Sequence, residues 1–355
     1  MTRASRLLPS TKPSLQHLAD ICSQRATPEQ YQQASSIRNN VPIYDIPPHR
    51  ALDQTQRSSL QDEWYHVLCR GPGVFVTKGL FQDHHLIDRT TSVLKGIISL
   101  ESSSGNSQGD HFAGTGNNDR IWNSLGKHAT ADPASFVRYY SNPWLSSVCN
   151  SWLGPGYRIT AQANNAKPGA EAQGVVAHVD VPLNSGPTRL LPFSQTFEPG
   201  YVAHQLPEFR EYFLNNYVEL PLEKGDGIFF NPALFHGAGE NQSTDIQRMV
   251  NLLQVSSAFG KPMESLDSLT IVKSTWDDAS QLFKDTGLSE EIEALLPVLG
   301  ESYPFPTNLD VQRPDAANLA PGSEVDIIRN ALVRGSSLAE VLEALENHRA
   351  NRKAG

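Results

Sequence analysis

A histidine and an aspartate stand two residues apart in the apolar stretch VVAHVDVP, Val175 to Pro182. The valines and the alanine predict a buried strand, on which residues i and i+2 point to the same face. Burying His178 and Asp180 together is costly unless a cation or hydrogen bonds compensate. A divalent metal would do so, and the alternative is a simple His–Asp hydrogen bond on a sheet surface. This stretch alone leaves both interpretations open.

A second histidine, His236, lies downstream in the small-residue context FHGAGEN, and Arg248 follows at the start of another apolar run. Two histidines and one carboxylate are the donor set of non-haem Fe(II) sites that keep coordination positions open. Those positions suit a bidentate 2-oxo acid and dioxygen. The guanidinium of Arg248 can pair in bidentate fashion with a second carboxylate, such as that of 2-oxoglutarate. We therefore predict His178, Asp180 and His236 as metal ligands and catalytic residues, and Arg248 as the co-substrate anchor.

Glycines follow His236 at positions 237 and 239. Because glycine has no Cβ, we expect them to let the backbone approach a ligand closely.

Short β-type runs separated by Gly and Pro dominate the middle of the chain, and helix signals flank them. A helix is predicted from Thr27, with Pro28 at its first position and Gln30 completing a capping box. Two further capping boxes, Ser323 with Asp326 and Ser337 with Glu340, predict a C-terminal helical hairpin. The predicted strands are GVFVT (73–77), YRITAQA (157–163), PTRLLPF (187–193), GIFF (227–230) and MVNLLQVSSAF (249–259).

The order helix, all-β core, helix lacks the βα alternation of a doubly wound parallel sheet. A Gly-rich phosphate loop and a G-x-S-x-G elbow are also missing from the sequence, which disfavours nucleotide-binding and hydrolase functions. The predicted fold class is mainly β with flanking helices.

Four segments within residues 74–260 resemble, in their order, the phytanoyl-CoA dioxygenase family of Fe(II)/2-oxoglutarate oxygenases, especially its fungal members in secondary metabolism. The segments are NDRIWNSLGKH, NPWLSSVCNSWLGPGYRITAQANNAKPGAEAQGVVAHVD, SGPTRLLPFSQTF and GDGIFFNPALFHGAGENQSTDIQR. The resemblance implies a double-stranded β-helix (jelly-roll, cupin-like) core and the same four site residues. It also implies that the retained carboxylate of Asp180 favours oxygenation, since halogenating relatives carry a small residue there.

One co-substrate contact departs from the family pattern. Many relatives have Gln three residues before the first ligand histidine, where this chain has Val175. Gln173, Gln162 or Asn164 could take that place, and Thr188 is a further candidate beside its expected role in a turn.

Residues 102–118, rich in Gly, Ser and Asn, predict either a lid or a disordered link. We expect the lid to close over the substrate, with His111, Trp122 or Asn123 in contact with it. The competing interpretation of Trp122 is core packing. His204, in the segment EPGYVAHQLPEF, is expected at the surface.

The predicted organisation is an N-terminal helical extension (1–40), a β-helix oxygenase core (41–263) and a C-terminal helical region (264–355). The predicted function is an Fe(II)/2-oxoglutarate-dependent dioxygenase that uses O2, releases succinate and CO2, and oxidises a small-molecule, secondary-metabolite substrate. Hydroxylation, desaturation and ring formation all stay open. The alternatives are a non-catalytic jelly-roll scaffold that binds a ligand and an acyl-CoA hydroxylase of the same family.

The net charge of -9 disfavours nucleic acid and anionic membrane surfaces as partners. Three separated cysteines fit a reducing compartment, and no apolar run is long enough to span a bilayer, so we expect a cytoplasmic protein. The sequon at Asn241 is expected to be unused. A homodimer through the terminal extensions stays open.

Overall fold

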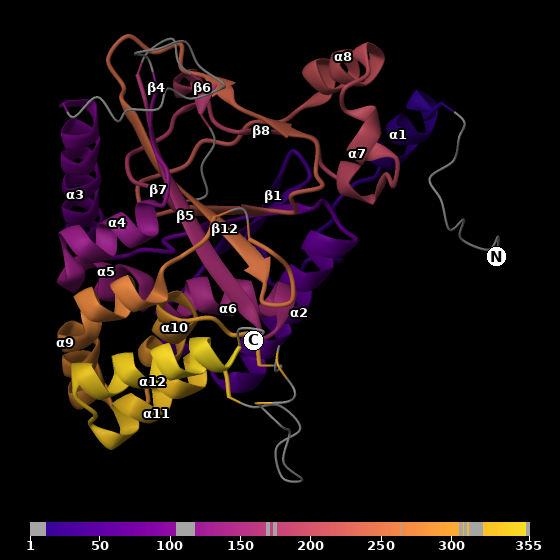
Figure 1. Ribbon diagram of the computed structural model, residues 1–355. Helices are drawn as coiled ribbons and strands as arrows, with labels where there is room; N and C mark the ends of the chain where they lie inside the picture. The colour runs from indigo at the N-terminus through magenta and orange to yellow at the C-terminus, as the bar shows by residue number, and fades with distance from the viewer. Residues whose placement is uncertain are drawn as a thin grey trace. The chain divides into compact units, whose positions relative to one another are not determined.

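The computed structural model describes residues 12–103, 118–167, 171–172, 176–262, 264–304, 308, 311 and 322–352 (Figure 1). The chain forms two compact units, and each unit is assembled from several separate segments. The first unit takes residues 1–80, 111–118 and 165–250, and the second takes 81–110, 119–164 and 251–355. The predicted boundaries at residues 41 and 264 stay a prediction.

The first unit contains most of the strands. Its helices are α1 (Leu15–Cys22), α2 (Gln54–Cys69), α7 (Gly200–Ala203) and α8 (Pro207–Asn216), with 3-10 turns at His49–Ala51, Leu183–Ser185 and Ser194–Thr196. Its strands are β1 (Ser36–Arg38), β2 (Val41–Asp45), β3 (Val74–Lys78), β6 (Glu171–Ala172), β7 (Val176–Ala177), β8 (Arg189–Leu190), β9 (Gly227–Phe230), β10 (His236–Gly237), β11 (Gly239–Glu240) and the start of β12 (Arg248–Ser257).

Five of these strands form a sheet in the order β1-β2-β3-β9-β7, with the start of β12 beside β7. The β2–β3 pair is parallel, whereas β1–β2, β3–β9 and β7–β9 are antiparallel. Two short antiparallel pairs, β10 with β8 and β11 with β6, complete the set. The core of this unit includes Val74, Val76 and Ile228 of the sheet together with Ala177 and Val181. The residues on either side of His178 and Asp180 are thus part of that core.

The turn before β9 is built around a buried carboxylate. Asp226 is 2% exposed, its Oδ2 lies 2.5 Å from Nζ of Lys78, and its Oδ1 accepts a hydrogen bond from the backbone N–H of Gly79. Oδ2 also accepts from the backbone N–H of Glu223. One side chain therefore ties the end of β3 to the start of β9, and these contacts explain why a charged residue is kept in an apolar region.

The second unit is mostly helical. Its helices are α3 (His84–Ser103), α4 (Ser124–Ala131), α5 (Pro133–Tyr140), α6 (Pro143–Leu153), α9 (Ser268–Thr286), α10 (Glu290–Leu299), α11 (Glu324–Arg334) and α12 (Leu338–Asn351). Its strands follow the order β12-β5-β4, with β5 at Tyr157–Ala166 and β4 at Asn118–Ile121.

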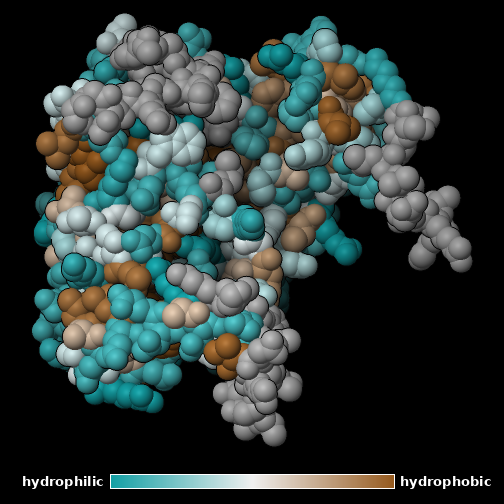
Figure 2. All heavy atoms as spheres, in the orientation of Figure 1, coloured by the Kyte–Doolittle hydropathy of each residue, from teal (hydrophilic) through white to brown (hydrophobic). Residues whose placement is uncertain are grey.

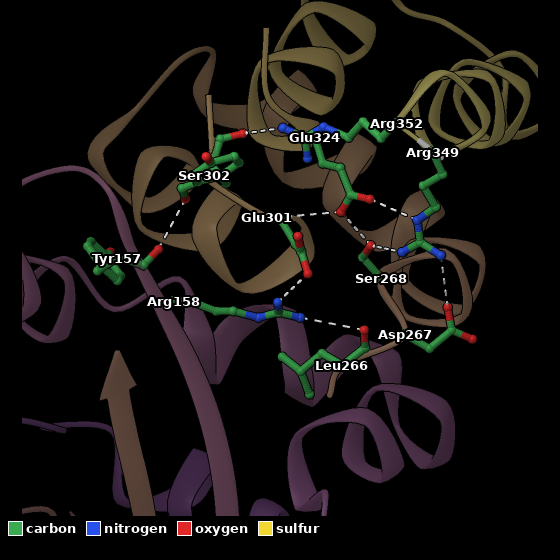
Figure 3. A network of polar contacts seen from close by, with 11 residues as sticks. Tyr157, Arg158, Leu266, Asp267, Ser268, Glu301, Ser302, Glu324, Arg349 and Arg352 are labelled. Atoms are coloured by element: carbon green, nitrogen blue, oxygen red, sulfur yellow. Dashed lines mark hydrogen bonds and ion pairs between the residues drawn. The ribbon is translucent and has the colours of Figure 1, made fainter. Parts of the chain in front are cut away.

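A polar network joins the C-terminal helices within the second unit (Figure 3). Glu324, at the start of α11, is 3% exposed and accepts hydrogen bonds from Ser268 Oγ (2.6 Å) and Arg349 Nε (2.8 Å). Arg158 of β5 pairs with Glu301 close by. The network connects α9 to the two C-terminal helices, α11 and α12.

The described chain is mixed α and β, with a large and mostly antiparallel sheet, so the expectation of a mainly β chain is only partly confirmed. Helices α2 to α6 fall inside the region expected to be β-rich. Their starts carry clear signals: a capping box at Asp53, and the pairs Asp132–Pro133 and Asn142–Pro143 at the starts of α5 and α6.

Most predicted strands and both C-terminal capping boxes are confirmed. GIFF is β9, GVFVT becomes β3 and YRITAQA begins β5, whereas PTRLLPF keeps only Arg189 and Leu190 in strand conformation. Ser323 and Ser337 cap α11 and α12, and Gly335 between them has a φ of 68°.

The predicted helix from Thr27 is wrong. The structure has only turns there, although the N–H of Gln30 and that of Tyr31 both bond to the Thr27 carbonyl. Strand β1 begins at Ser36, so the segment is too short to offset the cost of helix nucleation.

Candidate active site

His178 and Asp180 point to different environments. Strand β7 ends at Ala177, and the chain bends at His178. The side chain of His178 is 1% exposed, and its backbone N–H donates to the carbonyl of Met249 at 3.0 Å. Asp180 is exposed, and its Oδ1 accepts from the backbone N–H of Lys224 at 2.9 Å. The prediction that both share one face of a strand is therefore wrong, because the strand ends before the alternation can act on them.

His236 is prepared to act as a neutral ligand through one ring nitrogen. It lies in β10, opposite Leu190 of β8, and its Nδ1 is 2.7 Å from the carbonyl oxygen of Leu234. Since a carbonyl only accepts, Nδ1 carries the proton and the lone pair is on Nε2. Burial lowers the pKa of His236 more than the Leu234 carbonyl raises it. A neutral imidazole with one fixed N–H is the form that binds metals.

Arg248 is a fully buried cation at the first position of β12. Its side chain is 2% exposed, and Nη1 donates to the carbonyl of Ser185 at 3.2 Å. Burial lowers the pKa of Arg248 to about 10, while the charge of Glu219 opposes this shift. The guanidinium therefore stays protonated at neutral pH.

Thr188 shares a small cavity with Arg248. The other walls of this cavity are apolar and include Val181, Leu222 and Ile228. A hydroxyl and a guanidinium in an apolar enclosure can bind a small carboxylate. The structure thus places Thr188 where a co-substrate contact is possible.

The three predicted metal ligands do not form a metal-holding group in the described part of the chain. Among the described residues, no set of three or more His, Cys, Asp or Glu side chains is placed to hold a metal ion. One reason is the position of Asp180, which is exposed and whose carboxylate accepts a hydrogen bond from the Lys224 N–H. The donor set still has the chemistry that Fe(II) prefers.

A larger cavity, of about 580 Å³, borders His236. Segment 232–238 forms one side, and α7 and α8 with the residues before them form much of the rest. His204, expected at the surface, is exposed and also lines this cavity. The sequence patterns described above do not predict this cavity. One indication of it in the sequence is the spacing of Phe209 and Phe213, which are four residues apart on α8 and therefore place two aromatic rings on one face of the helix.

The glycines after His236 have structural tasks. A Cβ on Gly239 would lie 2.1 Å from the carbonyl oxygen of Pro187, so this glycine lets two backbone segments pack together. Gly186, on the other side of that contact, has a φ of 71° and would clash with the Glu240 carbonyl if it carried a Cβ. We expected Gly239 to let the backbone approach a ligand, but in the structure it lets the backbone approach another segment of the same chain. Gly237 lies beside the ring of Phe213, and a Cβ there would be 3.4 Å from Cε1 of that ring.

The remaining described candidates belong to the second unit. Gln162 is fully buried, its Oε1 accepts from Arg120 and its Nε2 donates to Glu264 at 3.2 Å. Asn164, 2% exposed, follows on the same strand.

Trp122 and Asn123 precede α4. The Trp122 ring is 37% exposed and carries the guanidinium of Arg120 4.6 Å from its centroid, so it is not core packing. Asn123 has a φ of 50°, and its side chain accepts from Gly126 N–H as the cap of α4. Capping explains this asparagine without a ligand.

Two candidates, His111 and Gln173, lie outside the described residues, as does most of the expected lid at 102–118. The sequon asparagine is placed clearly: Asn241 is fully buried, and its Nδ2 donates to the carbonyls of Ala166 and Ile246. An amide held in this way is not accessible to glycosylation in the folded chain. No helix in the described ranges has both the length and the apolar character needed to cross a membrane.

The segment with the candidate site residues is also the segment with a known family match. Residues 168–250 match the family model of phytanoyl-CoA dioxygenase (PhyH). The resemblance predicted from the motifs is confirmed, and the match contains His178, Asp180, His236 and Arg248.

A curated relative, dioxygenase cdmD of Talaromyces verruculosus, is 38% identical over 82 residues, which are 23% of this chain and 24% of that protein. The chain thus matches about a quarter of that relative's length.

Similar solved structures include the non-haem α-ketoglutarate-dependent epimerase SnoN from nogalamycin biosynthesis, with a TM-score of 0.40 and 18% identity, covering 59% of this chain and 92% of that one. A second SnoN structure, in complex with Fe3+, α-ketoglutarate and nogalamycin RO, has a TM-score of 0.40 and 16% identity, over 59% of this chain and 93% of that one. The carbocyclase SnoK gives a TM-score of 0.42 and 14% identity, over 57% of this chain and 84% of that one.

Proposed function

We propose that this protein is an Fe(II)/2-oxoglutarate-dependent dioxygenase that oxidises a small organic molecule and releases succinate and CO2. The observation that carries the proposal is the PhyH match over residues 168–250, because this segment holds the two histidines, the carboxylate and the buried arginine that such chemistry needs. The relative cdmD is itself a dioxygenase by name. The proposal includes a double-stranded β-helix arrangement of the strands around the site.

In this proposal His178, Asp180 and His236 hold the iron. When bound, Fe(II) supplies the activation of dioxygen and the oxidative decarboxylation of 2-oxoglutarate. His236 would coordinate through Nε2, which its Nδ1–Leu234 hydrogen bond leaves as the acceptor. Asp180 would give up its hydrogen bond from the Lys224 N–H and bind the metal instead. The metal favours this change because its positive charge interacts directly with the carboxylate.

Arg248 would bind the carboxylate of 2-oxoglutarate that does not reach the metal. Its buried guanidinium lies in the small cavity with Thr188, whose hydroxyl can donate to the same carboxylate. Most walls of this cavity are apolar, so a charge pair formed there is screened less than one in bulk water. These residues orient the co-substrate and keep its charge compensated.

Iron binding and co-substrate turnover test the proposal together. Under anaerobic conditions the protein should bind about one Fe(II) per chain, and on addition of oxygen and 2-oxoglutarate it should form succinate. His236→Ala should lose most of the iron binding and most of the succinate formation. His84→Ala, which removes an exposed histidine of the second unit, should change neither. A His236→Ala variant that binds iron and forms succinate as well as the parent protein would contradict the assignment.

A further inference from the structure

The cavity beside His236 has the size of a site for a small organic molecule. Its volume of about 580 Å³ lies within the range of about 300 to 1,000 Å³ that is usual for ligand sites. All of the residues that line it belong to the first unit. The residues that line it differ from those that line the small cavity with Arg248 and Thr188.

Aromatic rings supply much of the cavity wall. Phe197 stacks on Phe209 with ring centroids 5.8 Å apart, and Phe213 and Tyr201 line the cavity beside them. Tyr201 is 87% exposed, although it is a large side chain on a short helix. Figure 2 shows hydrophobic residues gathered on the surface over α7 and α8. Such a wall favours a ring-bearing apolar ligand.

Basic side chains at the cavity wall can contact an anionic group. Arg189, His204 and Arg210 line it, against the carboxylate of Glu198. The charge of Arg189 is already offset, because its Nε lies 3.3 Å from Glu219. Arg210 is exposed, and it has no ion-pair partner within the part of the chain that the structure describes. One arginine is therefore available to an acidic group on a bound molecule.

We propose that this cavity binds the substrate of the iron site, and that the substrate is a ring-bearing apolar molecule with one acidic group that pairs with Arg210. The inference rests on the proposed function, because His236 is the residue that the cavity shares with the predicted iron site. A substrate bound here lies against the imidazole of His236, on the side formed by α7 and α8. The acidic group fixes its orientation, and the aromatic wall holds its rings.

Two fluorescent probes test the binding chemistry without iron or 2-oxoglutarate. The probes are 1-anilinonaphthalene-8-sulfonate and N-phenyl-1-naphthylamine, which share their rings but differ in the sulfonate. Tyr201→Ala should weaken both probes. Arg210→Ala should weaken the sulfonate alone, by about threefold as expected for an exposed ion pair, and Arg210→Lys should restore part of the loss. Arg38→Ala removes an exposed arginine of β1 and should have no effect.

A substrate panel links the cavity to the reaction. Ring-bearing carboxylic acids and their methyl esters are compared by the rate of succinate formation with iron and 2-oxoglutarate present. The acids should stimulate succinate formation at lower concentrations than the esters, and Arg210→Ala should remove this difference by raising KM for the acids while kcat stays the same. Equal response to acids and esters, or unchanged probe affinity in both Tyr201→Ala and Arg210→Ala, would overturn the inference.

Failure of the proposed function looks different. If the probes bind as expected but no compound leads to succinate formation, the ligand site is supported and the proposed enzyme function is contradicted. If succinate forms but substitution of Tyr201 and Arg210 has no effect, the enzyme function is supported and this substrate site is contradicted.

Discussion

Arg248 is the residue whose environment is hardest to explain by stability alone. A guanidinium that is 2% exposed bears a large desolvation cost, and its lowered pKa of about 10 expresses that cost. Nη1 donates to a backbone carbonyl, and the charge of Glu219 opposes part of the effect of burial. A ligand carboxylate in the adjoining cavity would stabilise the guanidinium further.

We expect Arg248→Ala to weaken the apparent affinity for 2-oxoglutarate by roughly 2–5 kcal/mol, because it leaves a ligand carboxylate buried without a cation. Iron affinity should change little. Arg248→Lys should recover only part of the loss, since a single ammonium cannot form a bidentate pair. The measurement is the dependence of succinate formation on 2-oxoglutarate, with Fe(II) titrated separately. An unchanged dependence in Arg248→Ala would assign the anchor to another cation.

His128 gives a prediction about pH. It is 1% exposed, its Nε2 lies 2.8 Å from Ser135 Oγ, and burial lowers its pKa from 6.5 to about 4. Because the folded pKa is lower, the unfolded chain takes up the proton first as the pH falls. The stabilisation by neutral His128 is therefore complete above about pH 6.5 and is lost between about pH 6.5 and 4, by up to about 3 kcal/mol.

Unfolding of the parent and of His128→Gln by urea, measured from pH 7.5 to 4, checks this. The variant should be the less stable protein at pH 7.5, and the difference should shrink as the pH falls. Ser135→Ala, which keeps the imidazole, should retain a pH dependence like that of the parent. A difference that stays constant over this range would show that His128 does not titrate on unfolding.

At the scale of single residues, the sequence allowed the choice of His178, Asp180, His236 and Arg248 but not their geometry. The i, i+2 rule applies only while a strand continues, and β7 ends one residue before His178. The strand end depends on pairing with Gly227 and on the Met249 carbonyl, which are about 50 and 70 residues away in sequence. Contacts of that kind cannot be read from a local pattern.

At the scale of elements, the C-terminal helices are defined by local capping signals, whereas their packing depends on contacts between residues distant in sequence. Helix α12 begins with a capping box at Ser337, which local sequence predicts. Its attachment depends on Arg349, which bonds to Glu324 of α11 and, through Nη2, to Ser268 of α9 (Figure 3). The sequence thus predicted the helices, whereas their attachment needed the structure.

We expect Glu324→Ala to lower the free energy of unfolding by roughly 1–3 kcal/mol, because Ser268 and Arg349 lose a buried acceptor. Arg349 is about one third exposed, so water compensates part of the loss. Glu324→Gln keeps an acceptor for Ser268 and should cost less. Glu343→Ala, an exposed glutamate of α12, is the matched control and should stay within about 0.5 kcal/mol of the parent in urea unfolding. Equal stability of Glu324→Ala and Glu343→Ala would mean that the network does not stabilise the fold.

At the scale of the whole molecule, the limits of the compact units cannot be read from the sequence. Each unit is assembled from separate segments, so composition changes along the chain do not mark its limits. The predicted iron ligands, Arg248 and the cavity beside His236 nevertheless all belong to the first unit. Ligand binding should therefore act first on the elements of that unit.

Binding raises the stability of whatever part of a protein forms the site, by about 2.7 kcal/mol when the ligand is present at 100 times its Kd. Under anaerobic conditions, Fe(II) with 2-oxoglutarate should slow amide hydrogen exchange most in β7, in β10 and at residues 248–250. Glutarate, which lacks the 2-oxo group, should slow exchange less at the same concentration, because it cannot chelate the metal. In Arg248→Ala the effect of 2-oxoglutarate should shrink while that of Fe(II) stays. Slower exchange confined to α11 and α12, with no change in the three site segments, would place the ligand in the second unit and contradict the site proposed here.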